Sequence, residues 1–556
     1  MLRFTTPGGA GPLTGPLTWG QRSIWPALVW LGEESHVLNL RYVLAVPPGR
    51  SVQDVADAIG TLVQRHHGLV TRFPHFATDA YQEVARHGTI PLPVHAAAAG
   101  EAERVAAEVC EEAGRRPFHH EVEWPVRFAL VLADGAPRQL AMVFSHLLFD
   151  GEGVRIVLEE LGLLFGGGDL PPVDGTWSPL TLAEHEQGAR ERARSAAAMR
   201  YWRTELLESP HTIFDVPMLR PESPRFRRLR MTSPALAVAA GRFAKEHRCS
   251  TSAAMLAAVA AILGYYTGHA RMALWLIASN RWRPEVARTI TKMTEPAICS
   301  VTLGDRSFGD FARATWKQAL VGYHHAAYDP ADWRVELESA QRLRGVHINR
   351  SIVFNDVRWT DGWPQAPQVT GTESTSVELV DQWDTQADQL FISVLNSEDS
   401  ATVDVEVDTA FLPDRVGRQL LTGMEALLVR AAARPVSLDE VGAITGIAPV
   451  VRGEDWVQVH GAGWVRPVEV ANLVAAVPGV TRCAVFTDAA RLVAYLVADR
   501  PQVTPAFVHD RVCSLCDRRT DVMAPQHYVL CAGPPADDSH AAWQSMPVIV
   551  AGGGRC

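Results

Sequence analysis

Apolar residues recur at helical spacing in two stretches that dominate the pattern of the chain. In residues 51–66 they fall on one face, and Ser51 stands where an N-cap is expected. Residues 251–266 carry a similar apolar stripe behind a Thr251-Ser252 cap. Both patterns predict amphipathic helices packed on a hydrophobic core.

Short runs of strand-forming residues alternate with these helical stretches. Residues 126–132 and 139–144 are apolar runs separated by a turn sequence at 133–137, so they predict a β-hairpin. Further helices are predicted at 101–112, 182–207, 235–247, 308–323, 413–433, 469–477 and 504–519, and further strands at 38–46, 270–277, 351–357, 389–395, 401–407, 456–460, 480–487, 490–498 and 527–531.

The end of the second hairpin strand carries the most informative polar residues. His146 and Asp150 follow the strand, and a helical pattern begins at Gly153. An unpaired polar side chain at the end of a buried strand costs about 1–3 kcal/mol, so these residues require a reason. From this stretch alone two interpretations stay open: an imidazole that acts in catalysis, or a histidine whose hydrogen bonds are satisfied within the core.

Composition narrows the class of protein. A length of 556 residues exceeds one ordinary core and predicts about three to four units. The net charge of −10, without a basic cluster, argues against nucleic-acid binding. No apolar run reaches the roughly 18 residues of a membrane span, and the N-terminus has no signal core, so a cytoplasmic protein is expected. The scattered cysteines are typical of reduced thiols.

Two groups of residues invite a metal site, and neither predicts one. His66 and His67 are adjacent, but no third ligand lies at helical spacing, which favours a polar helix end. His509, Cys513 and Cys516 have spacing that zinc sites use, yet all three fall on one predicted helix, where such spacing arises by chance.

The order of motifs along residues 14–435 resembles the condensation domain of nonribosomal peptide synthetases, a member of the chloramphenicol acetyltransferase-like superfamily. The matching residues, in chain order, are Leu17-Thr18, Gln21, Trp25, Arg65-His66-His67, Leu69, Thr71-Arg72-Phe73, Ser145-His146-Leu147-Leu148-Phe149-Asp150-Gly151, Tyr201-Trp202, Ser279-Asn280-Arg281 and Phe354-Asn355.

This resemblance implies an α/β fold with two chloramphenicol acetyltransferase-like lobes, 14–180 and 181–435, arranged as a V. A central tunnel would admit a phosphopantetheine arm from each face, supplied by carrier proteins. No other cofactor is expected to be bound tightly, and no metal.

The resemblance also assigns roles at the site. His146 matches the catalytic histidine, which takes a proton from the acceptor or holds the nucleophile and the oxyanion. Asp150 is expected to fix the loop by pairing with Arg281, and Gly151 to allow a tight turn or a close approach of the pantetheine arm. Ser145 stands where the family has its first histidine, and it can still form a hydrogen bond in support of the site.

Two further observations qualify these roles. A serine-hydrolase pair of Ser145 and His146 fails, because adjacent side chains at a strand end point to opposite faces. The family's Gly-Phe-Asn pattern is missing from residues 293–299. The resemblance therefore does not define the acceptor side of the tunnel.

Residues 447–535 resemble the small C-terminal subdomain of an adenylation domain, and 536–556 are expected to form a flexible tail. The matching stretches are Asp455-Trp456-Val457-Gln458-Val459-His460-Gly461, Val468-Glu469-Val470, Val477-Pro478-Gly479-Val480 and Leu492-Val493-Ala494-Tyr495-Leu496. The lysine with which that family orients its acyl-adenylate is absent, since no lysine follows Lys317. This unit is therefore expected to be a small α+β brace or docking surface that does not adenylate.

The leading hypothesis is a free-standing condensation enzyme that joins a carrier-bound acyl or aminoacyl thioester to an amine or hydroxyl acceptor. The chain contains no Gly-Gly-x-Ser stretch for a pantetheine arm, so carrier proteins in trans are the expected partners, with a carrier-bound or soluble acceptor. Two alternatives stay open: a non-catalytic platform that recruits carrier or tailoring proteins, and a coenzyme A-dependent acyltransferase.

Overall fold

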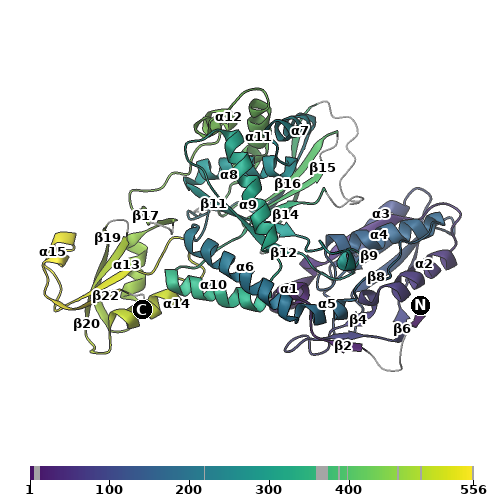
Figure 1. The fold of residues 1–556 in the computed structure, drawn as a ribbon, viewed down its shortest axis with the longest axis horizontal. Coiled ribbons are helices and arrows are strands. Elements are labelled where there is room, and N and C mark those ends of the chain that lie inside the picture. Colours follow the sequence, from purple (N-terminus) through teal and green to yellow (C-terminus); the bar gives the residue numbers. More distant parts are fainter. Residues whose placement is uncertain are drawn as a thin grey trace.

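Three bodies make up the protein, two lobes and a smaller C-terminal unit (Figure 1). The computed structural model describes residues 1–5, 13–217, 220–358, 374–385, 388–396, 399–459, 463–488 and 491–553. The first lobe lies at the right of Figure 1, the second at the top and the C-terminal unit at the left.

A four-stranded sheet forms the centre of the first lobe. The elements are β1 Leu2–Thr5, β2 Leu13–Gly15, α1 Trp19–Leu31, β3 Leu40–Ala45, α2 Val52–Arg65, β4 Thr71–Arg72, β5 Gln82–Val84, β6 His87–Ile90, β7 Val94–Ala97, α3 Ala102–Gly114, β8 Val126–Ala133, β9 Ala136–Phe144 and α4 Gly151–Gly166. The strand order is β3-β9-β8-β7, and β8 and β9 form the predicted hairpin. Helices α2 and α4 pack on one face of this sheet and α3 on the other.

The second lobe is built on a seven-stranded mixed sheet. Its elements are α5 Pro179–Glu186, α6 Ala189–Glu208, β10 Phe226–Ser233, α7 Pro234–His247, α8 Thr251–Thr267, β11 Arg271–Ala278, β12 Glu295–Thr302, α9 Phe308–His324, α10 Pro330–Arg344, β13 Ile352–Asp356, β14 Ser376–Trp383, β15 Leu390–Asn396, β16 Ala401–Asp408, α11 Asp414–Ala431 and α12 Val441–Thr445. The strand order is β12-β11-β13-β15-β16-β10-β14. Helices α7, α8, α9 and α11 cover one face, while α6 and α10 lie on the other.

Two local expectations for this lobe need correction. The single helix predicted over 182–207 is two helices, because the chain turns at Gln187 and Gly188 between α5 and α6. The N-cap of α8 is Ser250, whose hydroxyl accepts the backbone N–H of Ala253, and not Thr251-Ser252. Within the described ranges no single helix is long and apolar enough to cross a membrane; α7 and α8 pass that test only as a pair bent by 101°.

The C-terminal unit extends further along the chain than expected. It contains β17 Val457–Val459, β18 Gly463–Val465, α13 Pro467–Ala475, β19 Val480–Asp488, β20 Arg491–Ala498, α14 Pro505–Leu515, β21 His527–Cys531, α15 His540–Gln544 and β22 Val548–Gly553. The prediction of a loose tail from 536 is wrong for the described part, because β22 pairs with β21 and Trp543 is buried against the sheet. Residues 460–461, 490 and 554–556, which belong to predicted elements, lie outside the described residues.

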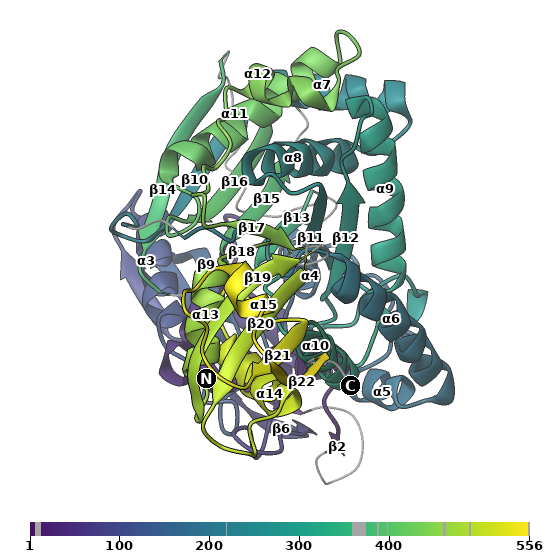
Figure 2. The same cartoon turned by 90° about the vertical axis from the view of Figure 1, so that its left-hand side faces the viewer.

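The C-terminal unit shares a hydrophobic core with the second lobe. Trp202, Ile298 and Tyr328 of the lobe belong to the same buried cluster as Val512 and Tyr528 of the unit. Both Figure 1 and Figure 2 place the unit beside α10. Burial of apolar surface on this scale makes the unit an integral part of the structure.

Polar contacts reinforce this junction. Arg452 forms an ion pair of 2.7 Å with the buried Asp215, and it also donates to a backbone carbonyl at the end of α8. The backbone N–H of Ala524 donates to the carbonyl of Gly345 at 2.7 Å. The last of these contacts joins the end of α10 directly to the C-terminal unit.

We expect Gly345→Ala to weaken this junction. Gly345 ends α10 with φ of 66°, and a Cβ there would lie 2.5 Å from the Cβ of Ala524. Gly446, which ends α12, also has φ of 66° but has no atom within 4 Å of a built Cβ, so Gly446→Ala is the matched control. In both variants the left-handed conformation of the new alanine lowers the free energy of unfolding by about 1–2 kcal/mol. Gly345→Ala should cost about 1 kcal/mol more, measured by urea unfolding, because Ala524 must move; equal losses would contradict this.

Candidate functional site

The loop between β9 and α4 holds the predicted catalytic residue. Strand β9 ends at Phe144 and α4 begins at Gly151, as the sequence pattern predicts. Asp150 caps α4, and its Oδ1 accepts the backbone N–H of Gly153 at 2.9 Å. The cap fixes the start of the helix and thereby the course of the loop that carries His146.

The orientation of His146 is set by its own loop. Its Nδ1 lies 2.5 Å from the carbonyl oxygen of Phe149. A carbonyl only accepts, so Nδ1 carries the proton and Nε2 of the neutral ring has the lone pair. Within the described residues Nε2 forms no hydrogen bond. Burial lowers the pKa of His146, and the charge of Lys292 lowers it further, so the ring is held in the neutral form that accepts a proton.

Asp150 links the two lobes through Arg281. The guanidinium donates from NH1 to Oδ2 and from NH2 to Oδ1, both at 2.9 Å, which is a bidentate pair. The backbone N–H groups of Met293 and Thr294 also donate to Oδ2, at 2.9 and 3.1 Å. Burial acts to raise the pKa of Asp150, but the charge of Arg281 and the backbone N–H groups of Met293 and Gly153 outweigh it and lower the pKa. The expected pair of Asp150 and Arg281 is thus present, and its role in fixing the loop stays a prediction.

The backbone around Arg281 is shaped for this contact. Asn280 adopts a left-handed conformation with φ of 55°, which asparagine tolerates better than most residues. Its side-chain amide donates to the carbonyls of Met293 and Ala326, both at 3.1 Å. The turn is therefore held from two sides, and Arg281 is aimed at the first lobe.

A segment of the second lobe, residues 289–294, lies directly against the first lobe. A Cβ on Gly20 of α1 would lie 1.9 Å from the carbonyl oxygen of Lys292, and a Cβ on Gly68 would lie 2.5 Å from that of Ile290. Both glycines are therefore needed for the close approach of the two backbones. Gln21 donates across the same junction to the hydroxyl of Thr291 at 3.3 Å.

Gly151 does not serve the predicted tight turn. It is the first residue of α4, and it is not among the glycines with positive φ. Any side chain tolerated at a helix start fits that backbone conformation. A close approach of the pantetheine arm to Gly151 stays a prediction.

Ser145 is held by a histidine that the sequence analysis did not single out. Its hydroxyl accepts the backbone N–H of Leu147 at 3.2 Å and shares a hydrogen bond of 2.7 Å with Nε2 of His120. His120 stacks on Phe76, and burial lowers its pKa to about 4. Ser145 and His120 are 1% and 5% exposed, so this pair braces the loop and offers no accessible nucleophile. The adjacent histidines at 119–120 carried no signal for this contact.

Ser145→Ala is expected to destabilise the protein by about 1–3 kcal/mol, because it leaves a buried nitrogen of His120 without its partner. Product formation by the folded variant should persist, since His146 keeps its own hydrogen bond. Thermal unfolding measures the stability, and Ser514→Ala, which removes an exposed hydroxyl from α14, is the control. An unchanged melting temperature in Ser145→Ala would contradict the bracing role.

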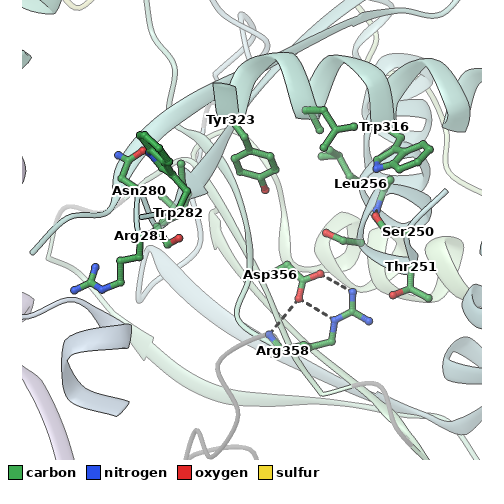
Figure 3. A pocket seen from close by; sticks show the side chains of 17 residues that line it. Ser250, Thr251, Leu256, Asn280, Arg281, Trp282, Trp316, Tyr323, Asp356 and Arg358 are labelled. Carbon is green, nitrogen blue, oxygen red and sulfur yellow. Dashed lines mark hydrogen bonds and ion pairs between the residues drawn. The ribbon is translucent and has the colours of Figure 1, made fainter. Parts of the chain in front are cut away.

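A cavity of about 710 Å³ lies in the second lobe beside Arg281 (Figure 3). It opens to solvent and is lined by the start of α8, by α9 and by the ends of β11 and β13. Trp282, Trp316 and Tyr323 give it aromatic walls, and the ion pair of Asp356 with Arg358 lies at its base in Figure 3. Its volume is in the range of cavities that hold small ligands.

A second, smaller cavity of about 50 Å³ shares Asn280 and Trp282 with the first. Its lining includes Glu295 and Glu186, and burial raises their pKa to about 7 and about 8 respectively. His146 does not line either cavity, so the central tunnel stays a prediction.

No group of three or more His, Cys, Asp or Glu residues is placed to hold a metal in the part of the chain that the structure describes. His66 bonds the buried Glu160 at 2.8 Å. His509 contacts the hydroxyl of Tyr528 at 3.2 Å and the thiol of Cys513 at 3.4 Å. Each histidine thus has protein partners.

Comparison with known proteins gives a consistent result. A family model of the condensation domain matches residues 14–437. Phosphinothricin tripeptide synthetase PhsC of Streptomyces viridochromogenes is 27% identical over 333 residues, which cover 57% of this chain and 30% of that protein. Bacitracin synthase 1 of Bacillus licheniformis is 22% identical over 438 residues, which cover 74% of this chain and 8% of that protein. The chain thus spans less than a third of the length of either relative.

Solved structures show the same two-lobed fold. The condensation domain from the monacolin K polyketide synthase MokA matches with a TM-score of 0.61 at 16% identity, covering 77% of this chain and 100% of that one. SgcC5 from Streptomyces globisporus matches with a TM-score of 0.57 at 19% identity, covering 76% and 99%. These matches confirm the predicted α/β fold of the two lobes.

Proposed function

Because the chain belongs to the condensation-domain family, we propose that it joins a carrier-bound acyl or aminoacyl thioester to an amine or hydroxyl acceptor. One relative named above is a phosphinothricin tripeptide synthetase and the other a bacitracin synthase, which supports a biosynthetic role of the same general kind. We place the carrier proteins in trans, each presenting its substrate on a phosphopantetheine arm. A cytoplasmic location is part of the same proposal.

The observation that carries this proposal is the state of His146. A neutral ring whose Nδ1 is tied to the carbonyl of Phe149 presents a basic Nε2. Nearby, the buried pair of Asp150 and Arg281 fixes the loop across the lobe junction. This combination suits general-base catalysis, because base and loop are positioned before the substrates arrive.

The reaction then needs one proton acceptor and no redox step. The nitrogen or oxygen of the acceptor attacks the thioester carbonyl, and Nε2 of His146 takes the proton that this acceptor amine or hydroxyl loses. The tetrahedral intermediate collapses, the carbon–sulfur bond breaks, and the proton passes to the thiolate of the pantetheine arm. The products are an amide or ester and the free carrier thiol. We propose that the 710 Å³ cavity, which adjoins Arg281, receives the body of one substrate.

A non-catalytic recruitment platform is the second candidate function. The observation in its favour is the C-terminal unit, which is joined to the second lobe by a common core and offers a large additional surface. Its likeness to an adenylation subdomain stays a prediction, as does its lack of adenylating activity. A coenzyme A-dependent acyltransferase is distinguished by its thioester donor alone.

The test is product formation by the wild-type protein, which is measured by mass spectrometry. Acyl thioesters of a carrier protein, of pantetheine and of coenzyme A are each offered with an amine and an alcohol acceptor. Product from the carrier thioester above a heat-denatured control supports condensation, and product from coenzyme A alone supports the acyltransferase. If no thioester yields product while carrier protein still binds, the recruitment platform replaces the proposal.

A further inference from the structure

A buried lysine lies at the junction of the lobes, in a chain with three lysines in all. Lys292 is 6% exposed, whereas Lys245 on α7 and Lys317 on α9 are exposed to solvent. Burying an ammonium is costly unless it is paired and hydrogen-bonded. Neither the motifs nor the role of His146 as a base accounts for Lys292.

The ammonium of Lys292 connects two segments, helix α1 and the start of β12. It donates to the hydroxyl of Ser23 on α1 at 2.7 Å and to the carbonyl oxygen of Thr294. It also pairs with Oε1 of Glu295, at 3.5 Å. Ser23 in turn donates to the carbonyl of Gly20 at 3.0 Å, so its oxygen is free to accept from the ammonium. Helix α1 of the first lobe is thereby tied to the start of β12.

The tied segment is the one that holds the catalytic loop. Met293 and Thr294, the two residues after Lys292, supply the backbone N–H groups that bind Asp150. The carbonyl of Lys292 packs on Gly20, which leaves this backbone little freedom to move. Loss of the ammonium would remove the tie to Ser23 from this segment, whose amides fix Asp150, four residues beyond His146.

We propose that Lys292 is a positioning residue for His146: its ammonium ties α1 to the start of β12 and holds in place the two amides that bind Asp150. The inference rests on the proposed function of His146 as a base. It assigns no contact between Lys292 and substrate.

The charge of Lys292 has a second consequence for His146. The charged groups that act on the imidazole are Lys292 and Asp150, and they oppose one another. Arg281 partly offsets the charge of Asp150, whereas burial raises the pKa of Glu295 to about 7, so Glu295 offsets the charge of Lys292 only as it ionises near and above that pH. Lys292 disfavours the imidazolium, and its removal therefore raises the pKa of His146. A higher pKa leaves less of the neutral base at acidic pH.

The variants are Lys292→Met, which removes the charge, and Lys292→Arg, which keeps it. We expect Lys292→Met to lower kcat by roughly tenfold or more, because misplaced groups lose the benefit of orientation. The acidic limb of the pH profile of kcat/KM should move to higher pH in Lys292→Met and much less in Lys292→Arg. Lys245→Met, which removes an exposed charge on α7, is the matched control. It should leave kcat and the acidic limb of the kcat/KM profile unchanged.

Ser23→Ala separates the tie from the charge. It removes one partner of the ammonium and keeps the cation in place, so kcat should fall moderately while the acidic limb stays where it is in the wild type. Ser23→Ala is also a smaller change than Lys292→Met. It therefore still tests the tie if Lys292→Met fails to fold.

A second readout does not depend on activity. In protein with ¹³C-labelled histidine, the NMR titration of His146 is assigned by its loss in His146→Ala. A higher pKa of His146 in Lys292→Met than in wild type supports the proposal even if no product forms. In that case the proposed function fails and the role of Lys292 stands. An unchanged titration and an unchanged kcat in Lys292→Met would overturn the role of Lys292 and leave the proposed function intact.

Discussion

Arg281→Ala is expected to lower the free energy of unfolding by about 3–5 kcal/mol and to remove most product formation. The reason is that Asp150, only 1% exposed, would keep its buried charge after losing a bidentate partner. The backbone N–H groups of Met293 and Thr294 would still donate hydrogen bonds to Asp150, but they carry no charge to offset it. Urea unfolding and the carrier-thioester assay measure the two effects on the same preparations.

The control for this variant is Arg434→Ala. Arg434 pairs with Glu440 through two hydrogen bonds as well, but both side chains are exposed, and little change is expected there. Arg281→Lys should recover only part of the loss, because an ammonium cannot form the two parallel hydrogen bonds. A loss in Arg281→Ala no larger than in Arg434→Ala would show that the lobes do not depend on this pair.

The same pair predicts a dependence on pH. The pKa of Asp150 is lower in the folded protein than in the unfolded chain, so its stabilising contribution is complete above the unfolded value and is lost as the pH falls through the folded value. Arg281→Ala removes the main cause of the lowering. Burial then raises the pKa of Asp150 in the folded variant, so the difference in free energy of unfolding between wild type and variant, measured by urea unfolding, should shrink as the pH falls.

The residues of the site fall into two classes by how far the sequence predicts them. His146, Asp150 and Arg281 could be located because strand and helix patterns frame the loop and the motif order resembles a known family. His120 and Lys292 could not, because each reaches the site from a distant element and nothing in its neighbouring sequence marks it. Contacts between residues far apart in the chain are set by packing, which no local pattern records.

The missed strands show the same limit in the fold. Strand β10 escaped prediction because it is rich in arginine and reads as a loop. In the structure Arg228 and Arg230 pair across the sheet with Glu406 and Asp404 of β16, at 2.9 and 2.6 Å. A polar strand becomes stable when its neighbour carries the opposite charges in register, and that register is a property of the folded sheet.

The C-terminal tail was mispredicted for a different reason. Its apolar run at 548–551 is short and follows a polar stretch, so it carries little signal alone. Strand β22 forms because β21 offers a free edge to it, and Trp543 anchors the turn between them. Predicting that pairing requires knowledge of the sheet order, which the sequence pattern leaves undetermined.

His146→Ala is expected to lower the rate of product formation by about 10²–10⁴-fold, the usual contribution of a positioned general base. Its free energy of unfolding should change by only about 1 kcal/mol, the worth of the single hydrogen bond to the carbonyl of Phe149. This separation of activity from stability distinguishes His146 from Arg281, whose loss affects both. His87→Ala, which alters an exposed histidine on β6, is the control and should match the wild type in both measurements.

The pH dependence of product formation is an independent test of His146 as the base. A base with a lowered pKa stays neutral into the acidic range, so wild-type activity should persist below the pH at which an ordinary histidine becomes protonated. The residual activity of His146→Ala should lose that acidic limb, because the titrating group is gone. If His146→Ala forms product at the wild-type rate with the same pH profile, then His146 is not the base, and the rate must come from the approximation of the two substrates alone.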